Sequence, residues 1–205
     1  MKSRPLSALC AFFLVFGHQY VHASAVLTFD DVSVTTTEAL IPDGYGGLNW
    51  TNVWVLKGPQ RYPSSGYDNG TVSGDYVALN GFENMAVVSG PVFNFEGAYL
   101  TAAWNNGLTV NVKGYSGANL LYDTTVNPLY SAPTWYQFDY LGVDRLELSS
   151  FGGTDADPVD GGSGKHFALD NFTITAVPIP PAVWLFGTGV LGLIGVSRTT
   201  RAGQR

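Results

Sequence analysis

The central part of this 205-residue chain is predicted to be all-β, an antiparallel β-sandwich of the jelly-roll type. Two observations predict it. Short runs of alternating apolar and polar residues recur along the chain, and no stretch has the period of an amphipathic helix. Gly and Asn interrupt these runs at close intervals, as turns between strands require. The predicted domain, residues 26–176, is long enough to enclose one hydrophobic core.

The alternation is clearest in residues 107–115, GLTVNVKGY, and 143–150, VDRLELSS. In the first run Val110 and Val112 would share one face with Leu108, while polar residues occupy the other, as in a half-buried strand. Further strands are expected at 26–34, 50–56, 75–79, 92–104, 119–126, 135–141 and 166–175.

Three Asn-Gly dipeptides suggest where strands turn back: Asn69-Gly70, Asn80-Gly81 and Asn106-Gly107. This pair accepts the positive φ angles of two-residue hairpin loops. We therefore expect a tight hairpin at each of the three positions.

The first 25 residues have the parts of a secretory signal peptide. Lys2 and Arg4 precede an apolar stretch at 6–16, and a small-x-small exit runs from Ala23 to Ala25. Cleavage is predicted after Ala25. The only cysteine of the chain lies in this segment, so the processed protein would contain no disulfide.

The predicted domain is strongly acidic. It holds all sixteen Asp and Glu residues and only five of the ten basic residues, giving a net charge of −11 against −6 for the whole chain. Such a domain should repel nucleic acid phosphates and anionic lipid, so neither is an expected partner. It could attract divalent cations.

The chain ends in an apolar segment. Residues 182–196 are fifteen residues without charge, which would form a helix of about 22 Å. This is somewhat short, because a membrane span needs about 20 residues. Prolines precede the segment, and the arginines after it would stay on the cytoplasmic side. We predict a transmembrane helix here.

Residues 177–205, with VPIPP, the apolar run and an Arg-containing end, resemble a PEP-CTERM sorting signal of Gram-negative bacteria. The motif falls on Val177, Pro178, Ile179 and Pro180, where the family has an acidic residue between the prolines. The resemblance implies an exosortase as processing partner and a temporary stay in the inner membrane. It further implies release to the cell surface or medium and association with exopolysaccharide or biofilm matrix.

Segments such as SGDYVALNGF and KHFALDNF also resemble those of a family of secreted domains that is common in PEP-CTERM proteins. No activity is established for that family of domains. The main prediction is therefore a non-catalytic exported protein. The alternative is a carbohydrate-binding module with an aromatic glycan site and structural calcium.

Aromatic residues supply the candidates for that glycan site. Tyr45, Trp50, Tyr62 and Tyr67 lie in or beside the loop-rich stretch 42–70 and could stack against sugar rings. The competing interpretation is that aromatic rings fill the core of the sandwich, as we expect for Trp104 and Trp135.

Three carboxylates are candidates for a calcium site: Asp30 and Asp31 in the first expected strand and Asp170 in the last. Chain ends often lie in neighbouring strands of a jelly roll. Alternation places Asp170 on the same face as Ala168, Phe172 and Ile174, which we expect to be buried. A buried carboxylate needs a partner. That partner could be structural Ca²⁺, backbone amides or Lys165.

A second acidic segment, with Asp155, Asp157 and Asp160, is a solvated loop or a weak metal site, because its spacing departs from that of an EF-hand. His166 is the only histidine of the domain, which excludes a two-histidine zinc centre within one chain. No Gly-x-Ser-x-Gly elbow occurs. The sequence therefore predicts that the protein is not an enzyme.

Overall fold

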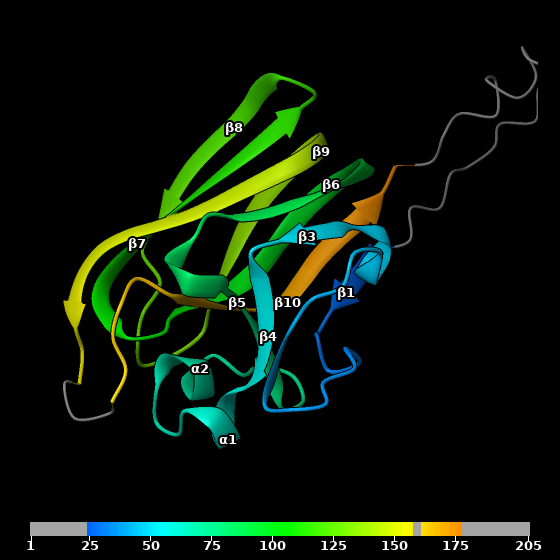
Figure 1. Cartoon of the computed structure of the whole chain (residues 1–205). Coiled ribbons are helices and arrows are strands. Elements are labelled where there is room, and N and C mark those ends of the chain that lie inside the picture. Colours follow the sequence, from blue (N-terminus) through cyan, green and yellow to red (C-terminus); the bar gives the residue numbers. More distant parts are fainter. Residues whose placement is uncertain (1–23, 158–160, 178–205) are drawn as a thin grey trace, which may run out of the picture.

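The computed structural model describes residues 24–157 and 161–177, which fold as an antiparallel all-β domain (Figure 1). The strands are β1 (Ser24–Leu27), β2 (Glu38–Leu40), β3 (Asn49–Thr51), β4 (Val53–Lys57), β5 (Tyr76–Asn80), β6 (Ala86–Ala102), β7 (Asn105–Ser116), β8 (Asn119–Val126), β9 (Thr134–Asp155) and β10 (Phe167–Ala176). Four single turns of helix join them: η1 (Tyr45–Gly47), α1 (Gly58–Arg61), α2 (Gly66–Asn69) and η2 (Gly81–Glu83).

Hydrogen bonds join the strands in the order β2-β4-β5-β10-β6-β9-β7-β8, with β1 beside β10 and β3 beside β6. The long strands β6 and β9 change register at several points along their shared length. Such irregularities let a sheet bend. Asn80 in β5 donates to Ser150 Oγ in β9 at 3.1 Å, although two strands separate them in the order, so the sheet curls back on itself.

The predicted all-β antiparallel class is therefore confirmed. The arrangement is consistent with the predicted β-sandwich, and the long strands β6 and β9 link its strands into one hydrogen-bonded sheet. The main core consists of apolar side chains from nearly every strand, from Leu27 in β1 to Ile174 in β10.

The strands β4, β5 and β10 bury both of their faces. In β4, Val53 and Val55 belong to the main core, whereas Leu56 belongs to a second, smaller cluster against which Trp54 packs. Because side chains alternate along a strand, the two clusters lie on opposite faces of this part of the sheet. The second cluster also takes in Tyr67 of α2 and Trp104 after β6.

Several expected strand boundaries were wrong. The strand expected at 26–34 ends at Leu27, and Phe29, with φ of 65°, begins a turn. The strand expected at 50–56 is divided by Asn52, whose φ is 57°. The strands expected at 135–141 and 143–150 are one bent strand, β9.

The three expected Asn-Gly hairpins were also wrong. Asn69 ends α2, and Gly81 begins η2 after Asn80. Asn106 and Gly107 lie inside β7, where the pairing with β9 skips Gly107. The two-residue hairpin that does form joins β7 to β8, where Ser116 pairs with Asn119. Local turn chemistry was overridden at these sites by packing against the sheet.

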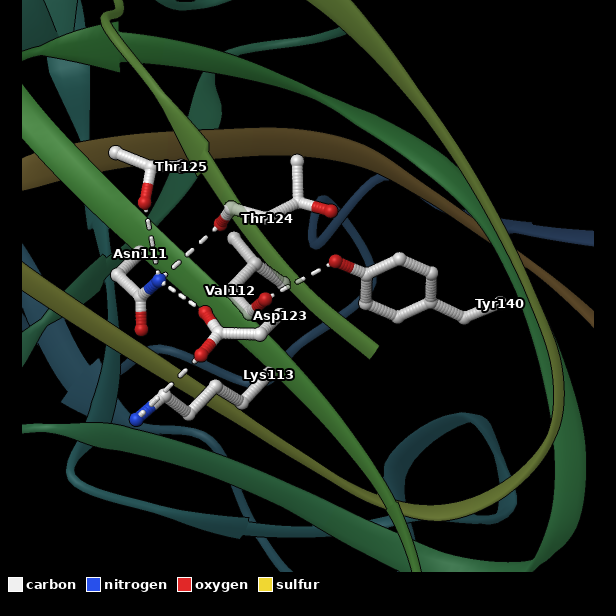
Figure 2. A network of polar contacts seen from close by, with 7 residues as sticks. All are labelled: Asn111, Val112, Lys113, Asp123, Thr124, Thr125 and Tyr140. Carbon is white, nitrogen blue, oxygen red and sulfur yellow. Dashed lines mark hydrogen bonds and ion pairs between the residues drawn. The ribbon is translucent and has the colours of Figure 1, made fainter. Parts of the chain in front are cut away.

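A polar network holds the edge strand β8 to β7 (Figure 2). Asn111 donates to Asp123 Oδ1 at 2.6 Å and to Thr125 Oγ1 at 3.1 Å. Lys113 Nζ lies 4.0 Å from Asp123 Oδ2, and the Tyr140 hydroxyl of β9 donates to the Val112 carbonyl at 3.0 Å. These side-chain contacts add to the backbone hydrogen bonds that pair β8 with β7 and β7 with β9.

The two ends of the described chain lie side by side, since Ser24 of β1 pairs with Thr175 of β10. This agrees with the expectation that the chain ends occupy neighbouring strands. The other end of β10, where Phe167 begins the strand, lies near α2 (Figure 1).

In the described part of the chain, no helix is long and apolar enough to cross a membrane. The predicted signal peptide lies outside the described residues except for Ser24 and Ala25, which are in β1. Also outside them are Ala23, the motif residues Pro178, Ile179 and Pro180, and the predicted transmembrane helix 182–196. Val177 is described and lies just after β10.

Candidate functional site: an aromatic cavity

A cavity of about 320 Å³ opens on the outer face of β4 and β5, beside α1 and α2. Most of its wall is aromatic or glycine, with a few polar groups among them. The lining residues are Glu38, Trp54, Leu56, Tyr62, Tyr67, Leu79, Gly81, Phe82, Trp104, Gly161, Gly162, Ser163 and His166.

Tyr67 and Trp104 form the floor of the cavity and are almost fully buried. The Trp104 ring stands edge-on to Tyr62 and Tyr67, with ring centres 5.1 Å and 5.3 Å apart. This perpendicular arrangement is one that aromatic quadrupoles favour. The rings of the floor therefore pack against one another in a defined geometry.

The position of Tyr67 follows from local sequence. The Ser65 side chain caps α2 by accepting the Tyr67 amide hydrogen at 3.1 Å. Gly66 donates its amide to the Ala103 carbonyl at 2.9 Å. A Cβ on Gly66 would lie 1.8 Å from the Ala102 carbonyl oxygen, so only glycine lets α2 pack this close to the end of β6.

Phe82 stands at the mouth of the cavity, and 77% of its surface is exposed. Its ring meets Trp54 edge-on at 5.7 Å. Phe82 and Glu83 both have positive φ angles, 55° and 60°, which cost about 1–3 kcal/mol each in residues other than glycine. An exposed aromatic ring held by a strained backbone is typical of a binding site.

The polar groups of the cavity have defined partners. Glu38 Oε2 lies 3.6 Å from Arg61 Nε, and the Arg61 guanidinium stacks on the Tyr62 ring at 4.8 Å. His166 Nδ1 is 2.9 Å from the Asn80 carbonyl oxygen. A carbonyl oxygen only accepts, so Nδ1 is the donor of this hydrogen bond.

Burial raises the pKa of the Tyr67 phenol well above its usual range, and the charges of Glu38 and Glu83 raise it further. The floor of the cavity is therefore neutral, with a hydroxyl that can exchange hydrogen bonds.

The structure divides the four predicted glycan residues into two pairs. Tyr62 and Tyr67 line the cavity. Tyr45 and Trp50 instead pack with Phe29 and Phe172 in the main core. Trp50 is 5% exposed, and its indole Nε1 donates to the Tyr45 carbonyl at 2.9 Å.

Sequence reasoning missed Trp54, Phe82, Glu38 and His166 as members of this site, and took Trp104 for core. One signal was available. Residues 53–56, VWVL, form an unbroken apolar run, which is typical of a strand covered on both faces. Such a run predicts that another part of the chain packs on the outer face of this strand.

Asp170 is fully buried and accepts four hydrogen bonds. Its Oδ2 accepts from the Val72 and Ser73 amides at 2.8 Å and 2.9 Å, and its Oδ1 accepts from Ser73 Oγ and the Asn171 amide. Burial raises the pKa of this carboxyl, and the hydrogen bonds oppose that shift. It therefore has the backbone partners that were one of the alternatives from sequence.

The face predicted for Asp170 was partly wrong. It lies on the side of Ala168, as expected, but Phe172 and Ile174 point to the main core. The register of β10 shifts between Asp170 and Thr173, and Asn171 has a φ of 49°. This bulge reverses the alternation.

The other two calcium candidates have their own partners. Asp30 Oδ1 accepts from the Asp75 and Tyr76 amides at 2.9 Å and 3.2 Å, and Asp31 Oδ1 accepts from the Tyr45 hydroxyl at 2.7 Å. Among the described residues, no three His, Cys, Asp or Glu side chains are placed to hold a metal ion.

In the second acidic segment, the Asp157 amide donates to Asp155 Oδ1 at 3.2 Å. Asp160 lies outside the described residues.

No known protein family matches the chain, and no curated protein matches it significantly. Among solved structures it is similar to a DUF4465 family protein from Bacteroides caccae, at 11% identity and a TM-score of 0.48, over 74% of this chain and 98% of that one. It is also similar to TmCBM61 in complex with β-1,4-galactotriose, at 13% identity and a TM-score of 0.37, over 65% and 93%. A variant of CBM29-2, a family 29 carbohydrate-binding module, matches at 12% identity and a TM-score of 0.36, over 76% and 93%.

All three TM-scores are below 0.5. What the cavity can bind therefore has to be argued from the geometry of this chain.

Proposed function

We propose that the domain binds a saccharide in the aromatic cavity. The observation that carries this is the grouping of accessible rings, Trp54, Tyr62 and Phe82, with the polar side chains of Ser163 and His166 in one concave site. A sugar presents apolar C–H faces that pack on aromatic rings, and hydroxyl groups that need hydrogen-bond partners. A mostly apolar cavity with a few convergent polar groups meets both needs.

The proposed role is binding without catalysis. Glycoside hydrolysis uses two carboxyl groups on either side of the scissile bond. The described lining of the cavity includes one carboxylate, Glu38, which is already paired with Arg61. This supports a site that holds its ligand unchanged.

The test is titration of the full-length chain and its Tyr62→Ala variant against a glycan array, followed by calorimetry on the glycans that bind. Loss of the half-buried Tyr62 ring should weaken binding by about fivefold to tenfold. Because the ring also packs on Tyr67 and Trp104, the melting temperature should fall, so affinities are compared at a temperature at which both proteins are folded. Phe151→Ala is the matched control, because Phe151 is an exposed ring on β9, outside the cavity lining. Equal affinities for the wild type and Tyr62→Ala would refute the proposal.

We further propose that the chain is exported and that an exosortase processes its tail, which leaves the domain at the cell surface or in the medium, associated with exopolysaccharide matrix. The order of Pro-rich motif, apolar segment and arginines in residues 177–205 supports this proposal. Mass spectrometry of protein recovered from the medium and the envelope tests it. A mature form that retains Arg205 would contradict tail processing.

The same measurement locates the first cleavage. Ser24 and Ala25 are two of the four residues of β1 and pair with Thr175 and Ile174. Cleavage after Ala25 would remove half of that strand, so the N-terminal mass decides whether the strand is kept.

A further inference from the structure

The charged residue in the described lining of the aromatic cavity is a carboxylate, Glu38, which is paired with Arg61 outside the lining. The Glu83 carboxylate lies against Gly164 in the adjoining loop. No Lys or Arg is among the described lining residues, although His166 is.

The aromatic wall adds to this preference. The face of an aromatic ring carries negative charge density and attracts a cation, most strongly where water is excluded. The protein itself gives an example, because the Arg61 guanidinium rests 4.8 Å from the centre of the Tyr62 ring and 3.6 Å from Glu38. Arg61 does not line the cavity, but its position shows that this ring and this carboxylate together can hold a cation.

The domain as a whole acts in the same direction. Residues 26–176 carry a net charge of −11, so a uronic or sulfated glycan would be repelled as it approached. A positively charged glycan would be attracted, with an effect that weakens as salt rises.

We propose that the cavity selects a glycan that carries protonated amino groups, an unacetylated amino sugar, with one ammonium group beside Glu38 and the aromatic rings. This inference rests on the proposed saccharide binding and names the chemical class of the ligand. The carboxylate and the ring faces would both attract the positive charge of the ammonium group. An N-acetyl group at the same position carries no charge and would lack both attractions.

Calorimetry of the full-length chain with three tetramers tests the proposal: β-1,4-linked glucosamine, its fully N-acetylated counterpart and galacturonic acid. The measurements share one mildly acidic pH and one low salt concentration. We expect the glucosamine tetramer to bind about tenfold more tightly than the acetylated one. The galacturonic acid tetramer should bind most weakly.

Glu38→Gln removes the charge and keeps the shape of the side chain. It should reduce the preference for glucosamine over its acetylated form to about threefold or less, since it also leaves Arg61 without its carboxylate partner. The acetylated tetramer serves as the folding control, because its affinity should change little. Asp123→Asn is the matched variant: Asp123 is also an exposed, ion-paired carboxylate, and it lies on β8. This variant should keep the full preference.

The outcomes separate the two proposals. If the acetylated or acidic tetramer binds best and Tyr62→Ala weakens it, the cavity is a saccharide site and the charge selection is wrong. If the glucosamine tetramer binds best but Glu38→Gln and Asp123→Asn reduce its affinity alike, the attraction comes from the net charge and the assigned position is wrong. If no tetramer and no arrayed glycan binds, the saccharide proposal fails and this inference fails with it.

Discussion

Two groups of aromatic residues in this protein have similar composition but different surroundings. The core aromatic group, Phe29, Tyr45, Trp50 and Phe172, belongs to the main core or packs against it, and Phe29 and Phe172 have no exposed surface. The cavity aromatic group, Trp54, Tyr62, Tyr67, Phe82 and Trp104, lies on the outer face of the sheet.

The difference comes from what covers each group. The core group lies inside the curled sheet among the other apolar side chains of the main core, so its rings are closely packed. The cavity group is covered only by single helical turns and by the loop around Gly162, which packs against the Trp104 ring. Short covering elements leave a gap that long strands would fill. The same residue types therefore serve stability in one place and can serve binding in the other.

The largest expected effect tests the core group. Trp50→Ala should reduce the free energy of unfolding by about 3–5 kcal/mol, because it empties the space between Phe29, Tyr45 and Phe172. Urea unfolding followed by fluorescence measures this. A loss below about 1 kcal/mol would mean that Trp50 does not have a core role.

The next effect concerns the carboxylate that anchors the loop beside the cavity group. Asp170→Asn replaces one accepting oxygen with a donor amide, which would face backbone amides or the Ser73 hydroxyl. We expect a loss of about 1–3 kcal/mol in the free energy of unfolding. An unchanged midpoint in urea would contradict the bonding described for Asp170.

The same variant tests the calcium prediction. If calcium binds at Asp170, added Ca²⁺ should raise the wild-type melting temperature and leave Asp170→Asn unaffected. A wild-type melting temperature that is the same in Ca²⁺ and in EDTA would remove that prediction.

The smallest effect has the opposite sign. Phe82→Gly relieves the positive φ of residue 82 and removes a ring that is mostly exposed, so stability should rise by about 0.5–1 kcal/mol. Glycan binding should weaken at the same time. Thermal unfolding and calorimetry on one preparation measure both. A variant that loses stability and keeps its affinity would show that Phe82 has a structural role.

The sequence was sufficient to predict the fold class, because β7 and β9 bury one face and their apolar and polar residues therefore alternate. It was also sufficient to place Tyr62 and Tyr67 among the candidates, since they lie in a loop-rich stretch. It could not separate them from Tyr45 and Trp50. That separation depends on which face of a strand is covered. The covering residues come from the chain around α1 and α2 and from the loop at 161–163, which lies far from them in the sequence.

The errors in the strands have a related cause. An Asn-Gly pair marks a place where the backbone can turn, but the neighbouring strands decide how it turns. At Asn80-Gly81 the chain enters η2, and a Cβ on Gly81 would lie 2.3 Å from the Trp54 ring, so this glycine makes room for a cavity residue. Likewise, the bulge at Asn171 reverses which residues of β10 are buried, a change that alternation alone does not reveal.

The strand β10 sets the distance between the two functional parts of the molecule. Its first residue is next to the cavity residue His166 and its last is next to the start of the C-terminal segment, so its ten residues separate the two by about 30 Å. Under the proposed anchoring through that segment, the cavity would lie at the far end of β10 from the point of attachment. Under the proposed saccharide binding, many copies on one surface could bind successive sugars of a single polymer, and the combined avidity would far exceed the affinity of one site.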